Sequence, residues 1–174
     1  MALDTITQAR LEITKIYIAA FNRVPDQGGL DNWYNQYAAG LMTYAQIAEG
    51  FTGQPEYITT YPTVLTNTEY INKIYLNVFG RAAEAGGLTN WTNQLDANVF
   101  TKGSIMKAML DAAAVTGNTD GLRLTNQATF GVQSILDSVP TATATAQLAN
   151  ITSDAATVTT ATAAVASSIN AGSS

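Results

Sequence analysis

The sequence predicts an all-α protein, and two observations support this. Apolar side chains recur every three or four residues in seven segments, which is the spacing of helices with one buried face. The hexapeptide GGLDNW, which begins at Gly28, returns as GGLTNW at Gly86, 58 residues later. A ligand site needs such a motif once, whereas an architectural joint that is built twice needs it twice. We therefore expect a helical bundle of two pseudo-repeated helix–turn–helix–helix units plus a C-terminal Thr/Ala-rich helix.

The first repeat, residues 5–57, is expected to open with a helix capped by Asp4 or Thr5. This helix ends near Arg23, because Pro25 disfavours a helical conformation at the residue before it. The tandem glycines that follow allow backbone angles closed to other residues, so we expect a tight turn there.

Two further helices complete this repeat. One is expected to begin near Leu30 and to end at Gly40, since glycine readily caps a helix C-terminus. The other is capped by Thr43 and buries Phe51. The segment TGQPEY then stops this third helix.

The second repeat, residues 66–117, restarts the same pattern. Between residues 15–36 and 73–94, twelve of 22 aligned positions are identical, which indicates an internal duplication. One further helical pattern follows and stops at Pro140. We expect residues 1–139 to form one duplicated helical domain.

Residues 140–174 differ in composition, since they are rich in Thr, Ala and Ser and carry only Asp154 as a charge. Such a composition is typical of a linker. An apolar seam at heptad spacing favours instead a helix over 144–170 that packs on other protein, either the upstream domain or a neighbouring subunit. The seam consists of Leu148, Ile151, Val158, Val165 and Ile169. Both interpretations, helix and linker, stay open at this point.

The composition excludes several classes of function. The net charge is −5 with only eight basic residues, which is too few for a nucleic-acid interface. The chain has no Cys and no His, so thiolate metal sites and the commonest general base are missing. The scattered carboxylates form no evident catalytic pair. No apolar run is long enough for a membrane helix. We therefore expect no enzyme, no nucleic-acid partner and no transmembrane segment.

The two tryptophans of the repeated motif have two possible roles. Trp33 and Trp91, with Phe21 and Phe79, are expected to be buried anchors of the core, because their spacing places them on inner helical faces. Alternatively, a partly exposed tryptophan stacks on a sugar ring. In that case Asn32, Tyr34 and Asn35 are the candidate glycan-binding residues.

Asp26 and Asp31 flank the first turn and are the candidate calcium ligands. Calcium prefers six to eight oxygen ligands, and the loop lacks EF-hand spacing. The second repeat keeps only one of the two carboxylates, since Thr89 aligns with Asp31. Helix capping is therefore the simpler role for these two side chains.

The segments IYIAAFNRVPDQGGLDNWYNQYAAG and IYLNVFGRAAEAGGLTNWTNQLDAN resemble an uncharacterised bacterial domain family. Its pattern is Arg-x-Pro-Asp-x-x-Gly-Leu-x-x-Trp, and its members occur in secreted, calcium-binding RTX-type proteins and in surface-layer proteins. The first copy matches closely, whereas the second has Ala83 and Glu84 in place of Pro and Asp. The resemblance implies an all-helical domain, type I secretion and an extracellular place at the bacterial cell surface.

Two non-enzymatic functions fit these observations. One is a structural and adhesive module of a surface-layer, matrix or filament protein, with copies of itself and cell-surface polysaccharide or lipopolysaccharide as partners. The other is a passive spacer in a secreted calcium-binding protein of the RTX type. The low charge and the C-terminal seam favour the first.

Overall fold

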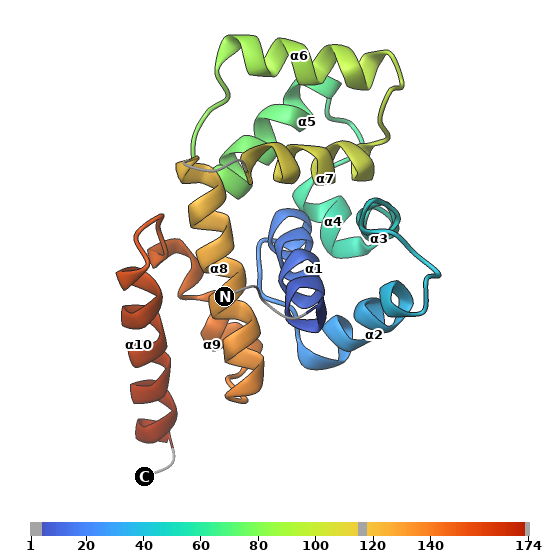
Figure 1. The fold of residues 1–174 in the computed structure, drawn as a ribbon. Coiled ribbons are helices and arrows are strands. Elements are labelled where there is room, and N and C mark those ends of the chain that lie inside the picture. The colour runs from blue at the N-terminus through green and yellow to red at the C-terminus, as the bar shows by residue number, and fades with distance from the viewer. Residues whose placement is uncertain (1–4, 115–117, 173–174) are drawn as a thin grey trace.

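The computed structural model describes residues 5–114 and 118–172. Within these residues the chain forms ten α-helices and no strand, which confirms the predicted all-α class. Figure 1 shows the helices arranged around α1 and α8, which lie side by side near the centre of the molecule. The expected cap at Asp4 and the end of the second repeat at 115–117 lie outside the described residues.

The first repeat contributes four helices. They are α1 (Thr5–Phe21), α2 (Gln27–Ala38), α3 (Tyr44–Phe51) and the short α4 (Pro55–Thr60). The second helix begins three residues earlier than expected, so Gly28 and Gly29 lie in its first turn and not in a tight turn. The chain reverses instead at Asn22, whose φ of 53° is left-handed.

The next segment repeats the order of α1 to α3 at a shift of 58 residues. Its elements are α5 (Asn67–Ile74), the π-helical turn η1 (Tyr75–Phe79), α6 (Ala85–Asp96) and α7 (Lys102–Ala113). The long α8 (Thr119–Leu136) follows. Both bounds of α2 and α6 differ by this same shift, and so do the starts of α3 and α7.

The helix ends correspond in the same way. Thr43 and Thr101 each accept a hydrogen bond from the backbone N–H three residues on, and both make full capping boxes. Left-handed residues close the preceding helices at Gly40, with φ of 72°, and at Asn98, with φ of 56°. Matching threonine caps therefore set where α3 and α7 begin, and left-handed residues at matching positions follow the ends of α2 and α6.

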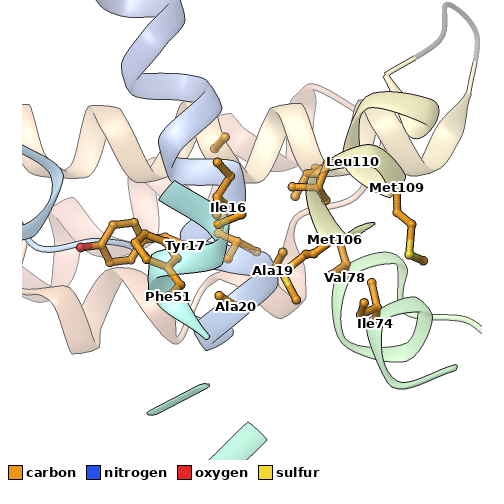
Figure 2. Close-up of a cluster of buried hydrophobic side chains, with 14 of the residues drawn as sticks. Ile16, Tyr17, Ala19, Ala20, Phe51, Ile74, Val78, Met106, Met109 and Leu110 are labelled. Atoms are coloured by element: carbon orange, nitrogen blue, oxygen red, sulfur yellow. The ribbon is translucent and has the colours of Figure 1, made fainter. Parts of the chain in front are cut away.

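One hydrophobic core runs through both segments. Figure 2 shows Tyr17 and Phe51 at one end of the cluster and Ile74, Met106 and Met109 at the other. Helix α3 packs against α7 so closely that a Cβ on Gly103 would lie 2.4 Å from the Cα of Glu49. The two segments are therefore halves of one packed unit.

Three buried tyrosines add polar links within the core, and the bond between Tyr57 and Tyr70 joins the two halves. The Tyr57 hydroxyl donates to that of Tyr70 at 2.6 Å, and the Tyr70 hydroxyl donates to the Lys102 carbonyl at 2.8 Å. The Tyr61 hydroxyl donates to the Ala19 carbonyl at 2.7 Å. Burial raises the pKa of Tyr57 to about 12, so these hydroxyls are neutral at ordinary pH.

The C-terminal segment forms α9 (Thr141–Thr145), the 3-10 turn η2 (Leu148–Asn150) and α10 (Ala156–Gly172). The single helix expected over 144–170 is therefore wrong, because the chain breaks between η2 and α10. Side-chain caps at the break explain it. Asp154 Oδ1 accepts from the Ala156 N–H at 2.9 Å, and Thr157 Oγ1 accepts from the Thr152 N–H at 3.0 Å.

The predicted seam is divided by this break. Leu148, Ile151 and Val165 are buried and Val158 is partly buried, whereas Ile169 is 39% exposed. Helix α10 lies along α8 of the same chain, at the outer edge of the molecule in Figure 1. The segment is thus ordered on the upstream domain, and the seam does not form one continuous face.

Candidate functional site

The second glycine of the repeated motif makes room for a tyrosine of the preceding helix. A Cβ on Gly29 would lie 2.4 Å from the Tyr17 hydroxyl oxygen, and a Cβ on Gly87 would lie 3.2 Å from that of Tyr75. Asp26 Oδ1 accepts from the Gly29 N–H at 2.6 Å and so caps the same turn. The glycine in both copies therefore serves close packing at the start of a helix.

Next to this joint lies a cavity of about 420 Å³ with aromatic walls, here called the aromatic pocket. Its walls are Tyr17, Phe21, Trp33 and Phe51. The Phe51 ring lies 4.9 Å from each of the other three rings. Contacts at this distance fix the orientation of the walls.

The rim of the aromatic pocket is polar and comes from distant parts of the chain. It consists of Arg23, Asn32, Gln54 and Glu56, together with Pro55. Arg23 and Glu56 form a bidentate ion pair, with Nε–Oε2 at 2.7 Å and Nη2–Oε1 at 2.9 Å. Asn32 and Gln54 are exposed, so their amides face solvent.

The charges at the rim stabilise each other. The hydrogen bonds from Arg23 lower the pKa of the Glu56 carboxyl, and the same bonds raise the pKa of the guanidinium. Burial raises the pKa of Tyr17, and the nearby Asp26 carboxylate adds to this effect. The pocket therefore presents a neutral phenol and a paired carboxylate, and neither is prepared to transfer a proton.

The second repeat has a smaller counterpart of about 230 Å³, here called the second pocket. Tyr75, Phe79, Arg81 and Trp91 occupy the positions of Tyr17, Phe21, Arg23 and Trp33. The remaining wall differs, because Met109 replaces Phe51 and alanines replace Gln54 and Pro55.

In the second pocket the arginine has two carboxylate partners. Arg81 lies 2.9 Å from Glu84 and 2.6 Å from Asp120, the latter at the start of α8. These bonds raise the pKa of the Arg81 guanidinium. The second pocket thus has an arginine with two carboxylate partners and the amide of Asn118 in its lining, and it lacks the exposed amide of Gln54.

The predicted core anchors are only partly interior. Phe79 is buried, whereas Phe21, Trp33 and Trp91 are partly buried and pack against the core from its edge. The expectation that both tryptophans are largely buried was therefore too strong. Their position at the edge of the core makes both tryptophans walls of the two pockets.

The three predicted glycan-binding residues do not converge. Asn32 lies on the rim of the aromatic pocket. Tyr34 lines a different cavity of about 540 Å³, with Tyr37 and Tyr44, and the Arg10 guanidinium covers its ring at 4.6 Å. Asn35 is exposed and lines neither cavity.

The two predicted calcium ligands have separate roles. Asp26 caps α2, and Asp31 forms an ion pair with Arg10 at 2.6 Å. Across the described ranges, no group of three acidic side chains is placed to hold a cation. The geometry favours capping and ion pairing over a shared calcium site.

Sequence reasoning missed Phe51, Gln54 and Glu56 as neighbours of the motif. Glu56 lies 33 residues beyond Arg23, and only the folded chain brings them together.

Neither the curated proteins nor the solved structures contain a match to this chain. In the described part of the chain, no helix is both long and apolar enough to cross a membrane. One family model, described as "Domain of unknown function (DUF4214)", matches residues 11–61 and 48–117. Together these segments cover most of both helical halves and the whole lining of the aromatic pocket. They also cover the second pocket except for Asn118 and Asp120 at the start of α8. The chain therefore belongs to the DUF4214 family.

Proposed function

We propose that this chain is a non-enzymatic, extracellular structural module that attaches to bacterial cell-surface polysaccharide or lipopolysaccharide. The aromatic pocket is its saccharide contact. The resemblance to domains of secreted and surface-layer proteins supports the location. The chemistry of the pocket supports the ligand.

The observation that carries the proposal is the pairing of aromatic walls with a polar rim. Apolar walls with a few placed polar groups are typical of small-molecule sites, and about 420 Å³ lies within their usual size. Sugars offer apolar ring faces and hydroxyl groups together. The amides of Asn32 and Gln54 both donate and accept hydrogen bonds, as hydroxyl groups require.

The same geometry favours binding over hydrolysis. Glycosidases use two carboxyl groups that face each other across the bond to be cleaved. The lining of the aromatic pocket contains one carboxylate, Glu56, and Arg23 holds it in a bidentate pair. A bound sugar would therefore meet no free acid or base at this rim.

The test removes the rim amides and leaves the walls intact. Titration calorimetry with purified lipopolysaccharide, and with its isolated polysaccharide portion, compares the parent with the double variant Asn32→Ala and Gln54→Ala. Loss of hydrogen bonds worth about 1.4 kcal/mol in total predicts about tenfold weaker binding. Both residues are exposed, so the fold should not change.

Asn35→Ala is the matched control, because it removes an exposed amide of the same helix outside the pocket. It should bind like the parent. If the parent binds neither probe, the module is a passive spacer. If the double variant binds as tightly as the parent, the contact lies elsewhere.

We further propose that the C-terminal segment takes part in self-assembly. Ile169 on α10 is 39% exposed and Leu136 at the end of α8 is 72% exposed, so apolar side chains remain uncovered on both helices. Replacing both with Asp should lower the particle mass in light scattering and leave the helicity unchanged. If the variant had the same mass distribution as the parent under conditions in which the parent assembles, this role would be contradicted.

A further inference from the structure

A fourth cavity, of about 450 Å³, lies where η1, α8 and the C-terminal segment meet, and is here called the arginine pocket. Arg123 and Gln127 of α8 line it, with Asn22, Asn77 and Thr145 from three other parts of the chain. Leu76, Leu148, Ala146 and Ala149 complete the walls. The lining thus combines one cation, three amides, a hydroxyl and apolar surface.

Arg123 differs from the other three arginines. Arg10, Arg23 and Arg81 each form an ion pair with a carboxylate. Over residues 5–114 and 118–172 no carboxylate lies within ion-pair distance of Arg123, and its only hydrogen bond runs from Nη1 to the Val78 carbonyl at 2.8 Å. The nearest acid on its own helix, Asp120, is engaged by Arg81. Arg123 therefore keeps unused N–H donors beside the cavity.

Its guanidinium is held in place and partly withdrawn from water. It lies beside Gly80, where a Cβ would be in ordinary contact with the Arg123 Cζ at 3.6 Å. Burial lowers the pKa of Arg123, which shows that its charge is incompletely solvated. A partly desolvated cation binds an anion more strongly than one in open water.

Gln127 is a second group without its full set of partners. Its amide nitrogen donates to the Leu148 carbonyl at 2.9 Å, while its amide oxygen accepts no hydrogen bond from the described residues. The side chain is only 3% exposed. Buried polar atoms are normally paired, but this oxygen is itself shielded from solvent, so it shows incomplete pairing within the pocket wall and not a contact that a ligand can reach.

We propose that the arginine pocket binds a hydroxylated carboxylic acid, such as a hexuronic acid. The carboxylate would pair with Arg123, as guanidinium groups pair with planar carboxylates. Ligand hydroxyls would meet the amides of Asn22 and Asn77, which line the same cavity. One cation matches one negative charge, which favours a carboxylate over a phosphate monoester with a charge of about −1.5 to −2. This site does not depend on the aromatic pocket.

The test is a nitrogen-15 NMR titration of the whole chain with D-glucuronate. D-glucose serves as the neutral probe and glucose 1-phosphate as the more highly charged one. Glucuronate should shift the signals of the Arg123 Nε–H and the Gln127 side-chain amide saturably. Glucose should bind at least tenfold more weakly. Glucose 1-phosphate binding as tightly as glucuronate would overturn the assignment of a carboxylate.

Three variants locate the site. Arg123→Gln should weaken glucuronate binding at least tenfold. The Arg123→Gln variant also loses the hydrogen bond to the Val78 carbonyl, so a second variant is needed. Ala146→Phe fills the pocket from an exposed position and leaves Arg123 in place. Lys73→Gln is the matched charge control, since Lys73 also lacks a carboxylate partner in the described structure and lines none of the pockets described above.

The control variant should bind as the parent does. Parent-like affinity in Ala146→Phe, or no saturable shift with glucuronate, would refute the proposal. Rim variants of the aromatic pocket should not affect this titration, so the two sites can fail separately.

Discussion

The aromatic pocket and the second pocket share a scaffold and differ at their rims. In both, an aromatic pair at a helix end lies at ring centroids of 5.4 Å, and an arginine covers the tyrosine ring. The first pocket is larger, and two exposed amides remain at its edge. At the second, the arginine has two carboxylate partners. The joint therefore keeps its packing in both copies, while the rim amides on which the proposed saccharide contact rests belong to the first copy alone.

The largest expected difference in unfolding free energy between the two joints comes from their tryptophans. Trp33 packs on the Phe51 ring at 4.9 Å, and its ring lies against Gly50, whereas Trp91 reaches Phe100 only at 6.4 Å. Trp33→Ala should cost about 3 kcal/mol of unfolding free energy, the lower end for a large aromatic, because the side chain is only partly buried. Trp91→Ala should cost less. Urea denaturation of both variants checks the order, and equal costs would show that the two joints are packed alike.

Replacing the second glycine of the motif should also cost more stability in the first copy than in the second. Gly29→Ala places a methyl group 2.4 Å from the Tyr17 hydroxyl and should cost about 2 kcal/mol through overpacking. Gly87→Ala meets the Tyr75 hydroxyl at 3.2 Å, so the gain in helix propensity of about 1 kcal/mol should largely offset the contact. Thermal unfolding measures both effects.

A double variant shows whether the hydroxyl is the cause. Tyr17→Phe removes the oxygen that the new methyl group would meet, so it should restore most of the stability lost in Gly29→Ala. If Tyr17→Phe and Gly29→Ala were simply additive, the glycine would be needed for another reason.

The ion pairs give a smaller contrast. The Asp120 side chain is 14% exposed and that of Glu56 is 53% exposed. Asp120→Asn should therefore cost about 1–2 kcal/mol, and Glu56→Gln less than about 1 kcal/mol. Chemical denaturation at neutral pH tests this order, and a larger loss for Glu56→Gln would reverse the comparison.

The pH dependence of the first pair follows from the lowered pKa of Glu56. A carboxyl whose pKa is lower in the folded chain stabilises the fold above its ordinary value of 4.5. That contribution is lost as the pH falls below 4.5 towards the lowered pKa. The stability difference between the parent and Glu56→Gln should accordingly shrink on acidification. A difference that is constant with pH would exclude a contribution from ionised Glu56.

The sequence predicts the helices well and the pockets poorly, for a physical reason. Helix limits depend on neighbours in the chain, so caps such as Thr43 and Thr101 can be read directly. The pocket rims depend on contacts over long separations, such as Arg23 with Glu56. The break before α10 was not predicted because the heptad seam indicated one continuous helix. Local caps by Asp154 and Thr157 interrupt that helix.

The central claim is that a saccharide contacts the first joint and not the second. The chain has two tryptophans, one in each pocket, so each can report alone. Trp91→Phe leaves Trp33 as the only indole, and Trp33→Phe leaves Trp91. Titration with lipopolysaccharide polysaccharide should change the fluorescence of the Trp91→Phe variant saturably and leave that of the Trp33→Phe variant unchanged. A response from Trp91 with none from Trp33 would contradict the account.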